Sequence, residues 1–246
     1  MKISIITVSY NSAASIGDTL RSVASQSHPD IEHIVVDGGS TDGTQSLLRQ
    51  EGRHLARWIS EPDRGIYDAM NKGLAMATGD LIGFLNADDM FAEASTVTQI
   101  AKTAEDADVI YGDLVYVSAN DTRQVVRMWR SGRFSRLQLK FGWMPPHPTF
   151  YVRRSVLEKV GRFDTALRIA ADYDFMLRTL ALPDLRVAGV SEVLVRMRTG
   201  GASNRSLKAM LRKSSEDLLV LRRSGVGGMA TLLCKNLRKL PQFISR

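Results

Sequence analysis

The sequence predicts an α/β protein with a mostly parallel central sheet flanked by helices. Two observations lead to this prediction. The first hundred residues alternate short, β-branched apolar runs with segments whose apolar residues recur at helical spacing. The chain has 246 residues, 44% of them hydrophobic, which is enough to bury the core of one large domain. Strands joined through helices run parallel, so their carboxyl ends meet at one sheet edge, where ligands of such sheets bind.

The individual elements follow from this alternation. Apolar runs predict four strands: residues 3–8, 33–36, 57–60 and 81–85. Apolar residues at helical spacing predict three helices between them: residues 12–23, 41–50 and 66–77. The loops expected to carry ligands are therefore those that follow the first, second and fourth strands.

The second half of the sequence is less regular. It predicts the following elements: a strand at 109–113, a hairpin with arms 114–117 and 124–129, helices at 155–160 and 172–180, and an extended segment at 185–197. Gly200 and Gly201 mark a flexible point, and a helical pattern follows from Leu207. We divide the chain into a main domain, residues 1–204, and a basic helical tail, residues 205–246.

The net charge of +7 belongs to the tail. Residues 205–246 hold ten of the 33 Lys and Arg residues but two of the 26 Asp and Glu residues, which leaves 23 and 24 for the main domain. Such a tail favours an anionic partner, either lipid headgroups or nucleic acid. A nucleic-acid-binding module would instead place a basic face on the main domain, so we expect no nucleic-acid partner.

Cellular location is predicted from the remaining bulk features. The N-terminus enters a strand at once and shows no secretory signal pattern, and no run approaches the roughly 18 apolar residues of a membrane span. The single cysteine, Cys234, excludes an internal disulfide. We expect a cytoplasmic protein, with peripheral attachment to the inner face of the cell membrane left open.

Adjacent carboxylates follow the fourth predicted strand. Asp88 and Asp89 would repel one another and lose hydration at the end of a buried strand, and a divalent cation would relieve both costs. Mg²⁺ or Mn²⁺ held by one or two carboxylates and a diphosphate is a common arrangement at phosphate-handling sites. The competing interpretation is a helix start capped by Asp, and the motif alone does not decide between them.

A Gly-rich loop, residues 37–43, follows the second predicted strand. Asp37 could accept hydrogen bonds from a base or ribose, and the glycines would let a ligand approach the backbone. In isolation the same residues predict a plain turn before a helix. The dinucleotide G-x-G-x-x-G motif and the P-loop lysine are both absent from the sequence.

Three further polar residues are candidates in the second half. Asp172 and Asp174 lie two positions apart on a predicted helix, so at most one of them faces a given site. Either caps the helix, or one deprotonates an acceptor hydroxyl. His147 lies in a proline-stiffened loop, where it is a metal ligand, a pocket residue or a structural residue.

Four segments taken together resemble the family 2 glycosyltransferases, which have the GT-A fold. They are residues 5–11 (IITVSYN), 35–44 (VVDGGSTDGT), 61–73 (EPDRGIYDAMNKG) and 79–89 (GDLIGFLNADD). The resemblance continues through residues 147–174 and covers about residues 1–200. Each motif alone is weak, but their order and spacing are specific.

The resemblance implies roles for the candidate residues. The donor site is assigned to polar residues near the predicted strand ends: Thr7, Ser9, Tyr10, Asp37, Asp63, Asn71 and Asp88. Asp89, assisted by Asp88, is assigned to Mn²⁺ or Mg²⁺, and Asp172 falls where the family carries its general base. The acceptor side is assigned to three residues: His147, Asp174 and Arg198.

The sequence departs from the family pattern at two positions. Gly38 stands where the family often has a second Asp, which removes one possible contact to the base. Asn86, instead of Asp, begins the D-x-D-type motif. A UDP-sugar is the favoured donor, but the change at Gly38 leaves the nucleotide open.

The variant motifs look like those of the branch that builds bacterial surface polysaccharides such as O-antigens and exopolysaccharides. The implied reaction is an inverting transfer from a nucleotide-sugar to a hydroxyl, commonly on a polyprenyl-diphosphate-linked glycan. A nucleotidyltransferase that makes sugar nucleotides is the rival enzyme class, but it requires a basic triphosphate loop, and residues 9–12 contain no Arg or Lys.

The tail combines basic residues with leucines at helical spacing. This pattern is typical of a helix that lies on an anionic membrane surface. It is equally typical of a helix that packs on the domain and exposes a basic face to solvent.

Overall fold

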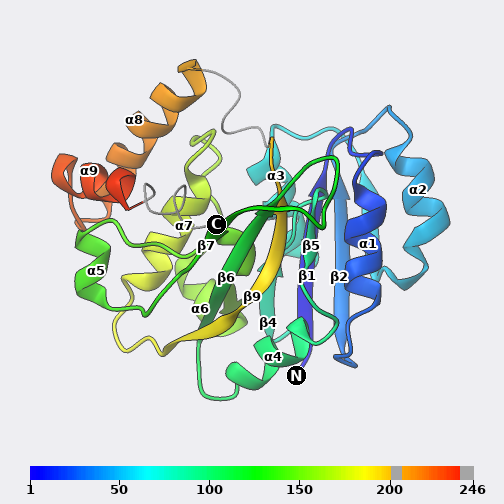
Figure 1. Ribbon diagram of the computed structural model, residues 1–246, viewed down its shortest axis with the longest axis horizontal. Coiled ribbons are helices and arrows are strands. Elements are labelled where there is room, and N and C mark those ends of the chain that lie inside the picture. The colour runs from blue at the N-terminus through cyan, green and yellow to red at the C-terminus, as the bar shows by residue number, and fades with distance from the viewer. Residues whose placement is uncertain (201–206, 239–246) are drawn as a thin grey trace.

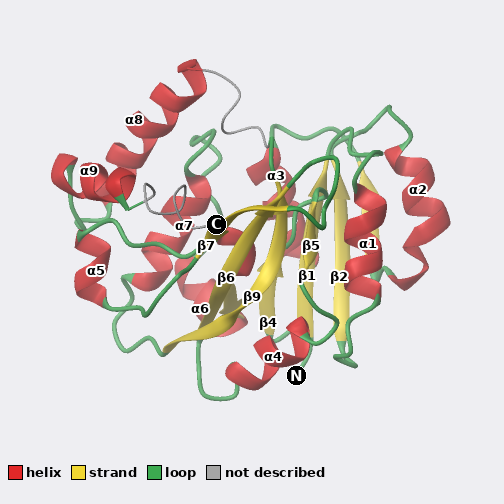
Figure 2. Ribbon diagram, in the orientation of Figure 1, coloured by secondary structure: helices red, strands yellow, loops and turns green. Residues whose placement is uncertain are grey.

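The computed structural model describes residues 1–200 and 207–238. In these ranges nine strands form one curled sheet with helices on both faces (Figures 1 and 2). The strand order is β3-β2-β1-β4-β8-β6-β9-β5, and β7 pairs with β6 off this path.

The first half has the predicted parallel arrangement. Its parallel strands are β1 (Ile3–Ser9), β2 (Ile31–Asp37), β3 (Arg57–Ser60) and β4 (Leu81–Phe84). The helices between them are α1 (Ile16–Ala24), α2 (Thr44–Glu51) and α3 (Ile66–Met76), with the short 3₁₀ turn η1 (Gly52–His54) after α2. The carboxyl ends of β1, β2, β3 and β4 therefore lie at the same sheet edge.

The second half is less parallel than predicted. It contains strands β5 (Asp89–Phe91), β6 (Val109–Val117), β7 (Val125–Trp129), β8 (Tyr151–Arg153) and β9 (Val187–Arg198). Four of the strand pairings are antiparallel: β4 with β8, β5 with β9, β6 with β7 and β6 with β8. Parallel neighbours need a long crossover connection, and the turn from β6 to β7 is too short for one.

The helices of the second half are α4 (Thr96–Thr103), α5 (Arg136–Lys140), α6 (Arg154–Val160), α7 (Ala171–Leu180), α8 (Leu207–Arg223) and α9 (Met229–Leu237). The 3₁₀ turn η2 (His147–Thr149) precedes β8. The predicted helices at 155–160 and 172–180 correspond to α6 and α7, and the predicted hairpin is formed by the end of β6 and by β7.

Alternate residues of each strand face opposite sides of the sheet. In β1, Ile6 and Val8 join a core with residues of α3, α6 and α7, whereas Ile3 and Ile5 join a core with residues of α1 and α4. Helix α2 covers the same side as α1. Both faces of the sheet are thus covered by buried cores, and the sheet places its loops along one carboxyl edge.

Helices α8 and α9 pack beside α7 at one end of the molecule (Figure 1). Val220, Leu221 and Leu232 are buried in the core that also contains α7. Of the two alternatives for the tail, packing on the domain is thus observed for these helices. The tail residues Arg205, Lys239, Leu240 and Phe243 lie outside the described residues, as does Ser203. No described helix is long and apolar enough to cross a membrane.

Candidate active site

Asp37, at the end of β2, is the most heavily hydrogen-bonded carboxylate of the sheet edge. It is fully buried and accepts hydrogen bonds from Ser9 Oγ at 2.9 Å, Ser60 Oγ at 2.6 Å and the Ser40 backbone N–H at 2.9 Å, besides one from Ser40 Oγ. Burial by itself raises the pKa of Asp37, but the hydrogen bonds from Ser40, Ser60 and Ser9 lower it below its ordinary value. Asp37 therefore stays ionised and fixes the ends of β1, β2 and β3.

The loops that follow β1 and β2 are joined into one unit. The Asn11 N–H donates to Ser40 Oγ at 2.7 Å, and Asn11 Oδ1 accepts from the Thr41 N–H at 3.0 Å. Asn11 has φ 49°, a left-handed conformation that Asn tolerates better than most residues. The Gly38 N–H donates to the Ser9 carbonyl at 2.9 Å. A ligand at this edge thus meets a preformed surface.

Gly38 makes room for the carboxylate of Asp63. A Cβ atom at Gly38 would lie 2.3 Å from Asp63 Oδ2 and 3.4 Å from Cδ2 of Tyr10. The Gly65 N–H donates to Asp63 Oδ1 at 2.8 Å, which fixes the side chain. Tyr10 is 66% exposed and offers its ring to a ligand. The departure at Gly38 therefore has a structural reason, because a second carboxylate reaches the same place from the loop after β3.

Asp89 is fully buried at the start of β5. Burial, followed by the charge of Asp88, raises the pKa of Asp89 well above its ordinary value. Within the described ranges, neither Asp89 Oδ1 nor Asn86 Oδ1 has a hydrogen-bond partner. Two orphaned oxygens beside a second carboxylate fit a hard divalent cation, since Mg²⁺ and Mn²⁺ prefer oxygen ligands.

The carboxylates of the described residues supply few of the ligands that such a cation needs. Among the described residues no group of three or more His, Cys, Asp or Glu side chains could hold a metal ion. Mg²⁺ is commonly bound by one or two carboxylates, with substrate phosphates and water completing the shell. The residues therefore fit a metal that arrives with a diphosphate.

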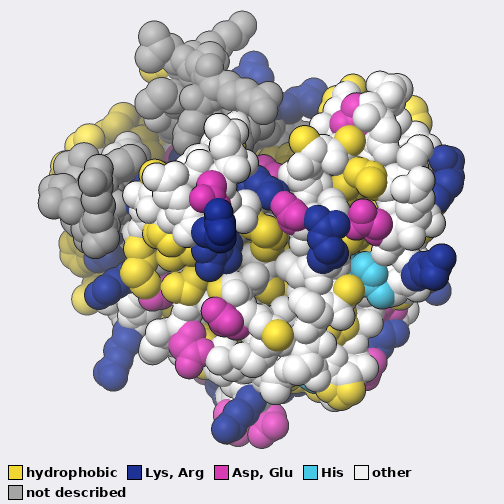
Figure 3. Space-filling view, turned by 45° about the vertical axis from the view of Figure 1, so that its right-hand side comes forward, with side chains coloured by type: hydrophobic (Ala, Val, Ile, Leu, Met, Phe, Trp, Pro, Cys, Tyr) yellow, Lys and Arg dark blue, Asp and Glu magenta, His cyan; other side chains and the backbone are white. Residues whose placement is uncertain are grey.

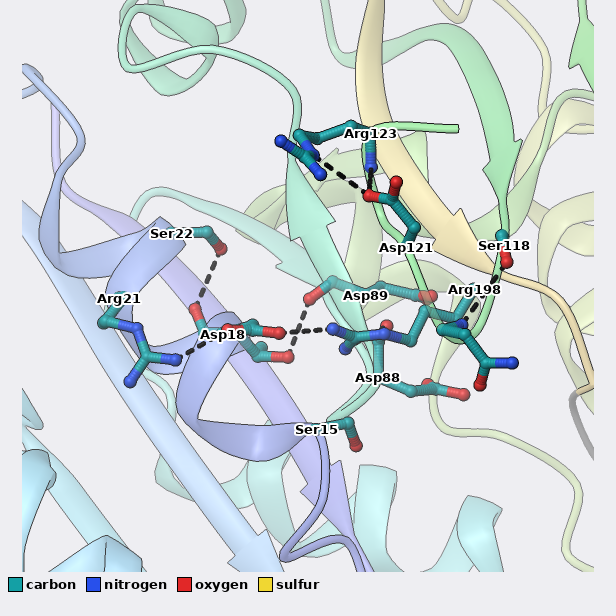
Figure 4. Close-up of polar contacts among 12 residues, drawn as sticks. Ser15, Asp18, Arg21, Ser22, Asp88, Asp89, Ser118, Asp121, Arg123 and Arg198 are labelled. Carbon is teal, nitrogen blue, oxygen red and sulfur yellow. Dashed lines mark hydrogen bonds and ion pairs between the residues drawn. The ribbon is translucent and has the colours of Figure 1, made fainter. Parts of the chain in front are cut away.

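Arg198, which the resemblance assigns to the acceptor side, contacts the segment that carries Asp88 and Asp89. Pairing of β5 with β9 sets Met197 opposite Asp89, so the next residue lies beside the Asp88–Asp89 pair. Its guanidinium forms an ion pair with Asp18 of α1, and a second nitrogen lies 3.4 Å from the Asp88 carbonyl oxygen. Figure 4 shows Arg198 reaching across this segment to Asp18. A guanidinium is thus held beside the Asp88–Asp89 pair, with Asp18 as its counter-ion.

Asp172 lies in the first turn of α7 and faces α3. Tyr67, in the first turn of α3, donates its hydroxyl to the Ile169 carbonyl at 2.6 Å and lies 3.2 Å from Asp172 Oδ1. Burial, and next the Asp172 charge, raise the pKa of Tyr67, so it remains a donor. Arg168 Nη1 donates to the Arg64 carbonyl at 3.1 Å, which joins this segment to the loop that carries Asp63.

Asp174 points elsewhere, as its spacing from Asp172 predicts. It forms an ion pair with Arg178 at 2.7 Å on the same helix, and Arg178 also donates to the carbonyls of Val160 and Arg162. These contacts give Asp174 a structural environment between α6 and α7. Its predicted acceptor contact has no support in this geometry.

His147 is buried among aromatic rings. It stacks on Phe84 with ring centroids 5.4 Å apart, and it meets the edge of Phe163 at 5.9 Å. Burial lowers the pKa of His147, and the charge of Asp172 opposes that shift. Its Nε2 atom has no hydrogen-bond partner among the described residues. A neutral imidazole thus connects the end of β4 with the surroundings of Asp172.

Two predicted donor contacts are corrected by the structure. The Thr7 side chain is fully buried, and its hydroxyl lies 3.0 Å from His33 Nε2, so it is not available to a ligand. Asn71 binds the backbone of Phe163 with both ends of its carboxamide, each at 3.0 Å. Asn71 therefore braces α3 against the segment before α7.

Several site residues were missed by the sequence prediction. Ser40 lies close to Asp37 in the sequence, and Asp side chains commonly bind backbone N–H groups of the turn that follows, so this signal could have identified it. Ser60, Tyr67 and Asp18 contact the site only through the tertiary fold.

The surface around the sheet is mixed in charge, and acidic and basic side chains are interspersed on the face shown in Figure 3.

The sheet edge and its carboxylates define a class, the nucleotide-sugar transferases with the GT-A fold. The model of the family described as "Glycosyl transferase family 2" matches residues 4–161. The chain therefore belongs to family 2 and is a glycosyltransferase. The PGL/p-HBAD biosynthesis glycosyltransferase of Mycobacterium tuberculosis is 35% identical over 188 residues, which cover 74% of this chain and 71% of the relative.

Solved structures support the same fold. TarS 1-349 of S. aureus in complex with UDP-GlcNAc has a TM-score of 0.69 at 21% identity, over 92% of this chain and 66% of that one. The mannosyltransferase PcManGT of Pyrobaculum calidifontis, in complex with GDP-Man and Mn²⁺, has a TM-score of 0.67 at 22% identity, over 98% of this chain and 70% of that one. In the longer TarS structure the match covers 39% of that chain.

Proposed function

We propose that this enzyme transfers one sugar, with inversion, from a nucleotide-diphospho-sugar to a hydroxyl of a glycan or lipid-linked acceptor. A UDP-sugar is the favoured donor. The observation that carries the proposal is the convergence of separate polar groups on one sheet edge. Asp37 and Asp63 lie at the ends of β2 and β3, Asp89 follows β4, and Asp172 is joined to that edge by Tyr67.

The donor's nucleoside is assigned to the surface formed by Tyr10 and Asp63. Asp37 is fully buried and acts indirectly, because it holds the ends of β1, β2 and β3 in place. The exposed Tyr10 ring supplies a stacking face, and the Asp63 carboxylate supplies an acceptor for N–H or O–H groups of the base or ribose. Ser9 acts indirectly, because its hydroxyl donates to Asp37. The solved neighbours carry UDP-GlcNAc in one case and GDP-Man in another, so the nucleotide has to be measured.

The diphosphate is assigned to the Asp88–Asp89 segment and Arg198. Asp89, with Asp88 and Asn86 beside it, would hold Mn²⁺ or Mg²⁺. When bound, the metal neutralises the negative charge that develops on the leaving diphosphate. Arg198 adds a fixed positive charge that this chain supplies itself.

Asp172 is assigned as the general base. It accepts the proton of the acceptor hydroxyl as the oxygen attacks the anomeric carbon, which contributes about 10²–10⁴-fold in rate for such bases. Tyr67 orients the carboxylate through its 3.2 Å contact. His147 lies behind this site and excludes water, because it is buried and packed on Phe84 and Phe163.

The acceptor is proposed to be membrane-bound, with a polyprenyl-diphosphate-linked glycan of surface-polysaccharide synthesis as the leading candidate. Helices α8 and α9 expose large apolar side chains: Leu211, Leu219, Met229, Leu233 and Leu237. Exposed arginines lie among them: Arg212, Arg222, Arg223 and Arg238. Apolar side chains with basic neighbours suit an anionic membrane surface at the inner face of the cell membrane.

The membrane assignment is tested by co-sedimentation with vesicles containing phosphatidylglycerol. Replacing Leu233 and Leu237 with Ser should lower the bound fraction, because both side chains are more than half exposed and contribute apolar area to the interface. Val125→Ser, an exposed valine of β7 beside Glu93 and Gln99, is the matched control. Equal binding by all three proteins would refute membrane attachment through these helices.

The donor site is tested by thermal stabilisation. Wild type is heated with UDP, GDP, dTDP or CMP, and with their sugars, each with and without Mn²⁺ or Mg²⁺. One nucleotide at 100 times its Kd should add about 2.7 kcal/mol to the unfolding free energy, but only when metal is present. Asp89→Asn should abolish the metal-dependent part, because it removes the charge of the ligand while keeping its shape.

Asp106→Asn is the matched control, because Asp106 is exposed and lies outside the site. It should respond like wild type. Stabilisation of Asp89→Asn equal to that of wild type would refute the metal assignment. No response of wild type to any nucleotide would refute the donor site as a whole.

A further inference from the structure

Glu216, on α8, binds the backbone immediately before α7. Its Oε2 atom accepts hydrogen bonds from the N–H groups of Ile169 at 2.8 Å and Ala170 at 3.0 Å. Its Oε1 atom accepts from the N–H of Arg168 at 3.2 Å. One carboxylate thus satisfies three successive backbone donors, two residues ahead of Asp172.

The sequence of α7 provides one side-chain acceptor for its first turn, Asp172 Oδ1, which accepts from the Tyr173 N–H at 2.8 Å. Its N-cap residue is Ala170, which has no side-chain acceptor. A helix start leaves several N–H groups without partners, and a carboxylate near them also interacts favourably with the helix dipole. The N–H groups of residues 168–170, just ahead of α7, donate to Glu216, which lies on a helix more than forty residues later in the chain.

The same stretch is held from the opposite side. Tyr67 donates to the Ile169 carbonyl at 2.6 Å, while Glu216 accepts from the Ile169 N–H. Both peptide groups that flank Ile169 are therefore fixed, one by α3 and one by α8. Asp172 lies three residues after Ile169.

Glu216 is itself held in place by the packing of α8. The adjacent Asp217 forms a buried ion pair with Lys235 of α9 at 2.8 Å, and Val220 and Leu221 are buried against the α7 side of the core. The position of the carboxylate is therefore set by the C-terminal helices.

We propose that Glu216 is a positioning residue for Asp172, acting through the three backbone N–H groups that it binds. This inference rests on the proposed role of Asp172 as general base. The C-terminal helices thereby complete the active site, although the family model ends at residue 161.

The test combines kinetics with hydrogen exchange on the full chain. Donor turnover is measured as nucleoside diphosphate released with water as the acceptor, using UDP-GlcNAc or the nucleotide-sugar that stabilises the protein best. The variants are Glu216→Gln, Asp172→Asn and the double variant, and Glu158→Gln on the exposed face of α6 is the matched control. Exchange of the amides of residues 168–170 is followed by mass spectrometry.

Glu216→Gln should lower kcat by roughly tenfold or more and leave the donor KM within about twofold, since a misplacement of about 1 Å can cost about 10²-fold. Amides 168–170 should exchange faster. In the Asp172→Asn background, Glu216→Gln should have little further effect on the rate, because both residues act on the same step. Glu158→Gln should behave like wild type.

Two results would overturn the inference. If Glu216→Gln and Asp172→Asn reduced the rate independently, so that their effects multiplied, Glu216 would not act through Asp172. If amide exchange at residues 168–170 were unchanged in Glu216→Gln, the hydrogen bonds from Glu216 would not hold this stretch in place. That result would overturn the inference even if Asp172→Asn were inactive as expected. Full activity of Asp172→Asn would instead refute the base assignment itself, and the exchange result would still report on the hydrogen bonds from Glu216.

Discussion

The buried ion pair between Lys235 and Asp217 makes the packing of α9 on α8 measurable. Both side chains are less than 10% exposed, their charged atoms lie 2.8 Å apart, and Lys235 Nζ lies 3.2 Å from the ring centroid of Tyr173. Lys235→Ala would leave the Asp217 carboxylate buried without its counter-charge. Breaking a buried pair in this way costs about 3–5 kcal/mol, which corresponds to a fall in Tm of roughly 10 °C for a chain of this size.

The assay is urea unfolding at pH 7, followed by circular dichroism. Arg222→Ala, an exposed residue of α8, is the control and should change the unfolding free energy by less than about 0.5 kcal/mol. The double variant Lys235→Met with Asp217→Leu should regain most of the loss, because a buried ion pair can be replaced by apolar residues at little cost. A loss below about 1 kcal/mol for Lys235→Ala would refute the packing argument.

The same pair predicts a pH dependence. Burial lowers the pKa of Lys235 from 10.5 to about 8, although Asp217 opposes the shift. Between these two values the unfolded chain keeps a proton that the folded chain has lost, so the contribution of Lys235 to the unfolding free energy rises with pH. The cost of burying the charged ammonium group is therefore absent above pH 10.5 and is fully present once the pH has fallen below about 8. Lys235→Met should lack this dependence.

Two further predictions concern the sheet edges. Burial raises the pKa of Glu32, but hydrogen bonds from Ser4 and Thr78 lower it from 4.5 to about 2, so Glu32→Gln should cost roughly 3 kcal/mol at pH 7. That difference should fade as the pH drops from 4.5 through 2, and a constant difference in acid unfolding would contradict it. Gly38→Ala should displace Asp63 and weaken nucleotide binding about tenfold in calorimetry, whereas Gly228→Ala, with open space around it, should bind normally.

The first half of the fold could be predicted because its pattern is local. Apolar strands alternate with amphipathic helices, and such alternation admits essentially one arrangement, a parallel sheet with right-handed crossovers. The positions of Asp37 and Asp89 at the carboxyl edge follow directly from that arrangement. The second half could not be predicted in the same way, because short strands such as β5 and β8 carry too few residues for a periodicity.

Side-chain direction was a second limit of the sequence. Thr7 and Ser9 lie two residues apart on β1, so their side chains point to the same face of the sheet. Only Ser9 lies at the carboxyl end of the strand, where it donates to Asp37, whereas the Thr7 hydroxyl is buried beside His33. The contacts of Asn71 and Arg198 could not be predicted for a similar reason. Their partners, the Phe163 backbone and Asp18, are distant in the sequence and are brought near only by the packing of α3 and by the pairing of β9 with β5.

The sequence by itself determined the fold class, the family and the strand ends at which the carboxylates lie, because these depend on residue types in short, ordered motifs. Only the tertiary structure decided which groups meet. It brought Asp63 into the space left by Gly38, Tyr67 to Asp172, and Glu216 to the start of α7. These contacts join residues that are far apart along the chain, and their distances depend on the packing of whole helices, which no local pattern encodes.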